Sequence, residues 1–126
     1  MRRFRFEASG YGVMEIVKDI LTLDELKRMA STLFENMVRA VVDVERELIA
    51  FDAELHSDLE ALLLEDGSKQ KDLWGINLYP EMQGDEFIEF DSMINMRPVQ
   101  GNLSRGIESS ETREKISAVV KKRIRR

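Results

Sequence analysis

The sequence contains no cysteine, so disulfide bonds, thiolate metal sites and cysteine nucleophiles are all excluded. It has a single histidine, His56, and any histidine-dependent acid–base step would have to use that residue. No apolar run reaches the 18 residues that a membrane-spanning helix needs, and the basic N-terminus has no apolar stretch of signal-peptide length. These absences predict a cytoplasmic protein without a membrane segment.

The residues that are present are typical of one globular domain. In a chain of 126 residues, 43% are hydrophobic and 34% are charged, which is enough to bury one core. The net charge of −5 is unevenly spread, with +2 over residues 1–13, −12 over residues 14–110 and +5 over residues 111–126. An acidic body repels nucleic acid, and the basic end has no aromatic residues for base stacking. We therefore expect a protein partner, if any, and the sequence predicts no oligomeric state.

The N-terminal third combines a flexible segment with a clear helix start. Residues 1–13 include Ser9-Gly10-Tyr11-Gly12 and are predicted to be a flexible extension of a single domain over residues 14–126. Met14–Ile20 is predicted to be a short strand. Thr22-Leu23-Asp24-Glu25 then forms a capping box, which predicts a helix over about residues 23–36.

Residues 38–50 and 54–65 alternate between apolar and polar positions, which is typical of half-buried strands. With a tight turn at Asp52-Ala53, the two runs predict a hairpin. A competing interpretation is a short helix, because Ser57-Asp58-Leu59-Glu60 is also a capping box and leucines at helical spacing precede Gly67. The alternation on both sides of the turn favours the hairpin.

Two further strands and a final helix complete the predicted fold. Leu73–Tyr79, ended by Pro80, and Phe87–Met96 are the strands, and the helix begins at Ser110. The sequence therefore predicts an α+β domain: an antiparallel meander of four to five strands with an N-terminal and a C-terminal helix packed on one face. The predicted core consists of Leu26, Met29, Leu33, Val44, Leu59, Leu63, Ile76, Ile94, Ile116 and Val120.

Several runs of residues together resemble one protein family. They are Glu54–Glu60, Leu63–Ser68, Asp72–Pro80, Ile94-Asn95-Met96-Arg97-Pro98 and Gly101-Asn102-Leu103-Ser104. Over about Met14–Ile124 the chain is similar to a family of short prokaryotic proteins of unknown function. The resemblance implies no activity, cofactor or catalytic residue. It does imply that Met14 corresponds to the usual start of the family.

The predicted hairpin would gather acidic side chains on one face. With the turn at Asp52-Ala53, Glu47 lies opposite Asp58 and Glu45 lies opposite Glu60. The full candidate face is Asp43, Glu45, Glu47, His56, Asp58 and Glu60. Carboxylates with one histidine suit Mg²⁺, Mn²⁺ or Ca²⁺ better than Zn²⁺. Strand-borne carboxylates without a flanking loop rarely surround such a cation, so we expect a solvated face and no tightly bound metal.

A second group of polar residues follows the later strands. It comprises Asn77, Asn95, Arg97, Asn102, Ser104 and Arg105. Two arginines beside the Gly101-Asn102 turn could bind an anion. Alternatively, the asparagines satisfy main-chain groups at strand ends and turns, and Arg97 pairs with Asp91 or Glu89. No phosphate-loop, dinucleotide-binding or nucleophile-elbow motif supports the anion site.

The function that these observations favour is a non-catalytic interaction or regulatory domain without a cofactor. An acidic face or an open sheet edge would contact the partner. The alternative is a divalent-metal-dependent hydrolase that uses the acidic hairpin face. The interaction domain is favoured because the sequence contains no recognisable nucleophile–base arrangement.

Overall fold

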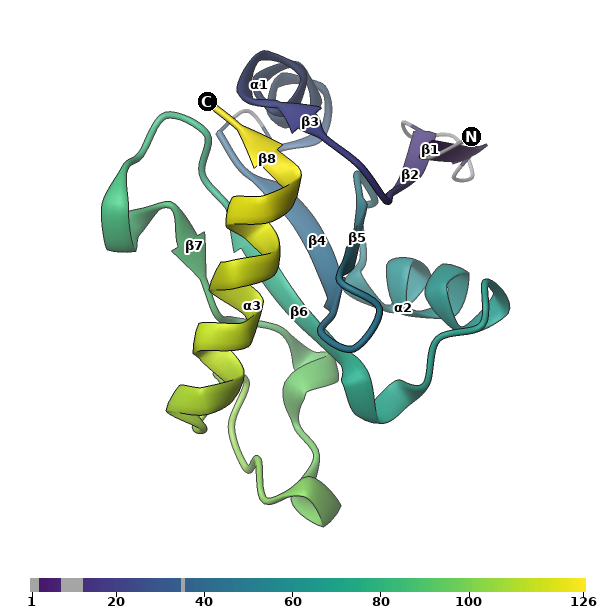
Figure 1. Cartoon of the computed structure of the whole chain (residues 1–126), viewed down its shortest axis with the longest axis vertical. Helices are drawn as coiled ribbons and strands as arrows, with labels where there is room; N and C mark the ends of the chain where they lie inside the picture. The colour runs from purple at the N-terminus through teal and green to yellow at the C-terminus, as the bar shows by residue number, and fades with distance from the viewer. Residues whose placement is uncertain (1–2, 8–12, 35) are drawn as a thin grey trace.

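The computed structural model describes residues 3–7, 13–34 and 36–126 of the chain, and they form an α+β fold (Figure 1). The strands in these ranges are β1 (Arg3–Glu7), β2 (Val13–Val17), β3 (Leu21–Thr22), β4 (Val38–Asp43), β5 (Leu48–Phe51), β6 (Leu73–Leu78), β7 (Ile88–Glu89) and β8 (Ile124–Arg125). The α-helices are α1 (Leu23–Leu33), α2 (His56–Glu65) and α3 (Ser110–Arg123). None of the helices in these ranges has the length and apolar character needed to cross a membrane.

The predicted antiparallel sheet is confirmed. Within the described ranges it has six strands in the order β1-β2-β5-β4-β6-β7. At its centre, β4 pairs with β5 on one side and with β6 along its whole length on the other. A separate parallel pair of β3 and β8 connects the start of α1 to the end of α3. The structure has a strand at Arg3–Glu7, and residues 1–2 and 8–12 lie outside the described residues. The flexible extension over residues 1–13 and the domain boundary at residue 14 stay predictions.

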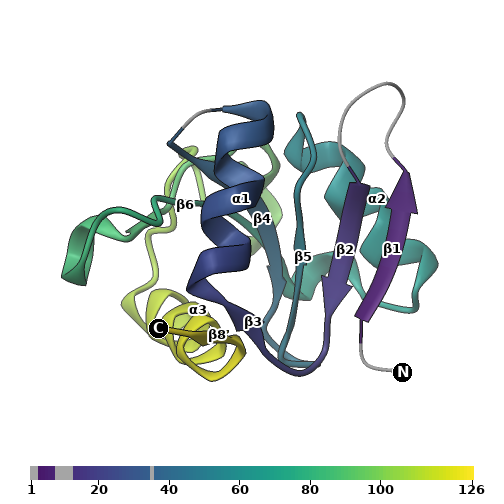
Figure 2. The ribbon, with the colours of Figure 1, turned by 90° about the horizontal axis from the view of Figure 1, so that it is seen from above.

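Helices cover both faces of the sheet. As predicted, α1 and α3 pack on one face, whereas α2 lies on the other (Figure 2). Alternate residues of β4 explain this arrangement, because Ala40 and Val42 face α1 and α3 while Val41 faces α2. All six residues of β6 are buried. Central strands that are apolar on both faces need cover on both sides, so the domain has three layers.

The two predicted terminal helices begin where the sequence places them. The Thr22 hydroxyl accepts a hydrogen bond from the Glu25 amide, and the Glu25 carboxylate accepts one from the Thr22 amide, which completes the capping box of α1. The Ser109 side chain caps α3 by accepting from the Thr112 amide. Both caps satisfy amides that the first helical turn leaves without partners.

The predicted hairpin with its turn at Asp52-Ala53 is wrong. The chain reverses at residues 44–47, between β4 and β5, and residues 56–65 form α2. The competing helix is therefore correct, although it begins after Leu55 and the Ser57 capping box is not formed. Gly67, with φ of 107°, ends the helix, and the Ser68 amide donates back to the Leu63 carbonyl over 2.9 Å.

Most of the predicted core is buried, and the exceptions follow from these corrections. Leu26, Met29, Leu59, Leu63, Ile76, Ile116 and Val120 are all buried. Val44 is half-buried because it lies in the turn after β4, and Ile94 is half-buried because the fourth predicted strand is reduced to β7. The side chain of Leu33 lies outside the described part of the structure.

The helical periodicity of α2 gives the first testable prediction. Leu62 and Leu63 are adjacent and both buried, which a strand with one solvated face would not allow. We expect Leu62→Ala and Leu63→Ala each to lower the free energy of unfolding by about 2–5 kcal/mol. The control is Leu64→Ala, whose side chain is exposed. Denaturant unfolding would contradict the arrangement if Leu62→Ala were as mild as Leu64→Ala.

Candidate functional site

The six residues of the predicted acidic face do not share one surface. Asp43 is fully buried at the end of β4, and its Oδ1 accepts from the amides of Glu45 and Arg46, both over 2.9 Å. Glu45 and Glu47 belong to the turn that Asp43 closes, whereas His56, Asp58 and Glu60 are in α2. The face was derived from the wrong hairpin, so its geometry is not formed.

Two of these carboxylates have cationic partners elsewhere in the fold. Glu47 binds the Lys122 ammonium of α3, and this hydrogen bond and charge lower the pKa of the Glu47 carboxyl. Glu60 lies 3.6 Å from the Arg97 guanidinium. Within the described residues, no three histidine or carboxylate side chains come together as metal ligands. The hydrolase alternative therefore loses the arrangement on which it was based.

His56 is the first residue of α2 and is buried against β6. Its Nε2 lies 2.8 Å from the main-chain oxygen of Ile76, which can only accept, so Nε2 carries the proton. Burial is the main cause that lowers the pKa of His56. The hydrogen bond to Ile76 opposes that effect, the charge of Arg39 adds to it, and the charge of Asp91 opposes it. His56 is thus a neutral, buried side chain that donates a hydrogen bond to β6.

Asn95 is fully buried and attaches an irregular segment, residues 92–107, to the sheet. Its Oδ1 accepts from the Gly75 amide over 2.8 Å, and its Nδ2 donates to the Gly75 carbonyl over 2.9 Å. The same Nδ2 donates to the Arg105 carbonyl over 3.1 Å. The side chain therefore pairs with β6 in the way that a neighbouring strand would.

Asn102 connects the two ends of the same segment. Its Nδ2 lies 2.7 Å from the carbonyl oxygens of both Asn95 and Gly106, and its Oδ1 accepts from the Glu108 amide over 2.8 Å. The main chains of Arg97 and Asn102 also form an antiparallel bridge. Gly101, with φ of 79°, allows the tight turn between them.

Arg97 fixes the outer part of the segment to the start of β6. Its guanidinium donates to the carbonyls of Gln70, Leu73 and Ile94. It also lies 4.7 Å from the centre of the Trp74 ring. The Arg97 side chain is only 9% exposed, so its donors are used within the fold.

Gly75 is the position on β6 where this segment approaches most closely. A side chain there would meet Ser92, whose Cβ would be 2.6 Å from an added Cβ. Ser92 is itself fully buried, and its amide donates to the Arg105 carbonyl over 3.0 Å. The close approach lets Asn95 reach the main chain of β6.

The structure therefore brings only part of the predicted polar group together. Its asparagines form hydrogen bonds within the fold, which was the alternative to anion binding. Asn77 is buried and donates to the Glu89 carboxylate over 2.9 Å. Arg105 forms an ion pair with Asp91 at 2.7 Å, and Ser104 is exposed. The expected pairing of Arg97 with Asp91 or Glu89 is wrong, because Glu60 is the acidic neighbour of Arg97.

The feature that sequence reasoning missed is the set of apolar side chains that this scaffold exposes. Seven large apolar side chains are exposed in the described part of the chain, and four of them lie between residues 93 and 103. Val99 is 101% exposed and Leu103 is 67% exposed, with Met93 and Met96 beside them in the sequence. We call residues 93–103 the apolar loop. Its sequence signal is an apolar residue on either side of a proline-and-glycine turn.

One comparison with known proteins assigns the chain to a family. A family model described as "Protein of unknown function (DUF5674)" matches residues 15–123. The chain belongs to this family. The match includes the apolar loop and its asparagine scaffold, and it confirms the resemblance drawn from the sequence motifs. No curated protein and no solved structure matches the chain.

The Asn95 scaffold gives the second prediction. Asn95→Asp keeps the size of the side chain but replaces a donor with an acceptor that faces the carbonyls of Gly75 and Arg105. We expect the free energy of unfolding at neutral pH to fall by about 2 kcal/mol or more. Lowering the pH should recover part of this loss, because a protonated carboxyl can donate. The control is Ser104→Ala at an exposed site, and an equal effect of both changes would show that Asn95 does not hold the segment.

The depressed pKa of His56 gives the third prediction. The folded state takes up the histidine proton at a lower pH than the unfolded state, whose pKa is near the ordinary value of 6.5. The free energy of unfolding should therefore fall as the pH is lowered through 6.5. An NMR titration of this single histidine checks the cause, and a midpoint at or above 6.5 would contradict it.

A second group titrates in an overlapping range with the opposite sign. Burial, followed by the charge of Glu15, raises the pKa of Asp52 to about 6. Ionised Asp52 thus destabilises the fold above that pH, and the effect disappears below its unfolded value of 3.8. Stability measurements on His56 are best made with Asp52→Asn. Asparagine also suits the φ of 74° at this residue.

Proposed function

We propose that this protein is a non-catalytic interaction domain whose apolar loop docks into an apolar pocket of a partner protein. The observation that carries the proposal is the contrast between order and exposure in residues 93–103. Val99 and Leu103 are exposed, yet the main chain around them is fixed by three buried side chains, those of Asn95, Arg97 and Asn102.

The energetics of the loop favour binding over a purely structural role. Exposed apolar side chains add nothing to the core, and ordering a segment costs conformational entropy. Here hydrogen bonds from buried polar side chains offset that cost, so the loop is ordered before any partner arrives. A preorganised loop loses less entropy on binding, and rigidly held loops are common binding elements.

The chemistry of the loop restricts its partner. Between Met93 and Ser104 the one charged residue is Arg97, and its side chain is buried. The exposed surface of the loop is therefore uncharged and convex at the Pro98–Gly101 turn. A concave, apolar pocket on a folded protein fits this surface, and binding should depend little on salt.

We place this activity in the cytoplasm, on the basis of the cysteine-free composition. Nucleic acid is disfavoured as a partner because residues 14–110 carry a charge of −12.

The test compares cross-linking from two exposed positions. A photo-crosslinking amino acid replaces Val99 in the apolar loop or Ala61 on α2, and both variants are expressed in cells that contain the native partner. We expect one protein to cross-link from position 99 and not from position 61. Adding Leu103→Ser to the position-99 variant should abolish that product.

The substitution must act on binding and not on folding. Leu103→Ser changes an exposed side chain, so we expect the free energy of unfolding to change by less than about 0.5 kcal/mol. Identical products from positions 61 and 99, or a product that contains only a second copy of this chain, would refute the proposal.

A further inference from the structure

A groove runs along α3 at the edge of the sheet that β7 forms. One hollow, of about 480 Å³, lies between Phe90 and the first part of α3. A second hollow, of about 460 Å³, lies between residues 84–88 and the last part of the helix. Ser117 and Lys121 line both hollows, so the two lie next to each other along the helix. We call them together the α3 groove.

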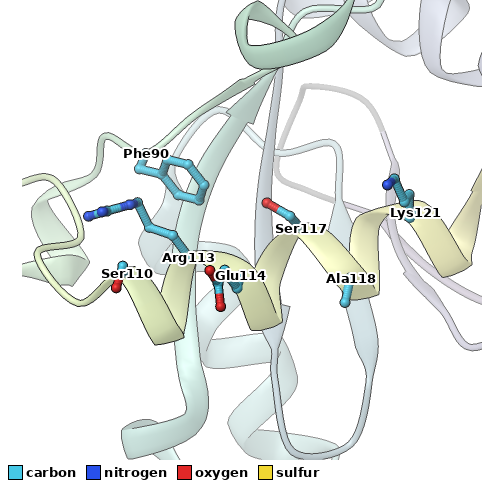
Figure 3. A pocket seen from close by; sticks show the side chains of 7 residues that line it. All are labelled: Phe90, Ser110, Arg113, Glu114, Ser117, Ala118 and Lys121. Carbon is cyan, nitrogen blue, oxygen red and sulfur yellow. The ribbon is translucent and has the colours of Figure 1, made fainter.

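The side chains of α3 that line this groove form one row. Arg113, Ser117 and Lys121 follow each other at intervals of four residues, and they extend toward the side on which Phe90 lies (Figure 3). On the opposite wall, the half-buried Ile88 and Phe90 supply an apolar surface, whereas the buried Phe87 ring has the Arg126 guanidinium 4.5 Å from its centre. The groove thus has one apolar wall, and its other wall carries the cationic side chains of Arg113 and Lys121.

The charges of the groove favour an acidic occupant. Its lining has three basic side chains, Arg113, Lys121 and Arg126, and two acidic ones, Asp85 and Glu114. Lys121, at the centre, makes no ion pair or hydrogen bond with any side chain in the described residues. Residues 111–126 as a whole carry a charge of +5, whereas the body of the chain is acidic. The groove is therefore a cationic site on an acidic protein.

The register of β7 supplies a main-chain contact at the groove. The Tyr79 amide donates to the Phe87 carbonyl, and the register pairs Asn77 with Glu89, so the Phe87 carbonyl and the main-chain groups of Glu89 are directed toward β6. The Phe87 amide instead donates to the Gly84 carbonyl. The amide and carbonyl of Ile88, between Phe87 and Glu89, face away from the sheet. Farther along, the Arg105 carbonyl already accepts from the Ser92 amide. Ile88 is thus a place where an extended segment can pair with the edge.

We infer that the α3 groove binds an extended, acidic peptide segment of a partner protein. Alternate apolar side chains of the segment lie against Ile88 and Phe90, acidic side chains reach Lys121 and Arg113, and the main chain pairs with Ile88. The groove uses none of residues 93–103, so this inference is independent of the proposed function of the apolar loop.

The test starts from a displayed library of random nine-residue peptides, selected on the purified full-length protein. We expect the selected peptides to be enriched in aspartate and glutamate alternating with valine, isoleucine or phenylalanine. The tightest peptide is then synthesised for titration by calorimetry. Selection of basic or uncharged peptides would overturn the inference.

Two variants of α3 that each replace a lysine with glutamate, and so change the charge equally, locate the site. Lys121→Glu should weaken binding of the selected peptide by about tenfold or more, because it reverses the central charge of the groove. The matched control is Lys115→Glu, at an exposed position of the same helix that lines neither hollow. An equal loss in both variants would indicate general charge attraction and refute the site.

The main-chain contact is tested on the peptide, so that folding of the protein is not at risk. N-methylation of one peptide amide at a time should weaken binding by about three- to tenfold at the residue opposite Ile88, where a hydrogen bond is lost. If no single N-methylation of the peptide weakened its binding, the extended pairing with Ile88 would be contradicted. Val99→Ser in the apolar loop should leave the affinity unchanged, and a loss there would show that the peptide binds the loop instead.

Discussion

The hydrogen bonds between the Asn95 side chain and the main chain of Gly75 hold the irregular part of the molecule on the sheet. They require three conditions at once: no side chain at Gly75, a small residue at position 92, and full burial of Asn95. Water then cannot compete for the amide, and loss of the pair would leave buried polar groups without partners. Through this contact, a segment with few regular elements acquires a definite shape.

The domain consists of a buried core and two exposed features, the apolar loop and the α3 groove. β4 and β6 are buried from both sides, by α1 and α3 on one face and by α2 on the other. The apolar loop leaves this core beyond Asn95, and the α3 groove lies where the sheet ends at β7. One feature is convex and uncharged, and the other is concave and cationic. They therefore suit different partner surfaces and should respond differently to salt.

Sequence patterns located the terminal helices but not the hairpin, for physical reasons. Thr22 and Glu25 form a local capping box, so α1 is encoded by residues that touch each other. In contrast, β5 is buried on both faces and has no alternating pattern. The turn before β5 contains Glu45 and Glu47, which continue the apolar–polar alternation of β4. The sequence pattern therefore hides the point at which the chain reverses. The helix α2 begins after Leu55 without a side-chain cap, and the capping-box pattern at Ser57–Glu60 lies inside the helix, so the sequence does not mark its true start.

By itself, the sequence determined the α+β class, both terminal helices, strand β6 and most of the buried residues, because these depend on periodicity and on contacts within a few positions. It also identified Asn95, Arg97 and Asn102 as a group. Only the tertiary structure decided what that group does, since its partners are main-chain groups of residues far away in the chain, such as Gly75 and Gln70. The exposure of Val99 and the neighbourhood of α3 and Ile88 were decided in the same way, because exposure and proximity depend on which segments pack together.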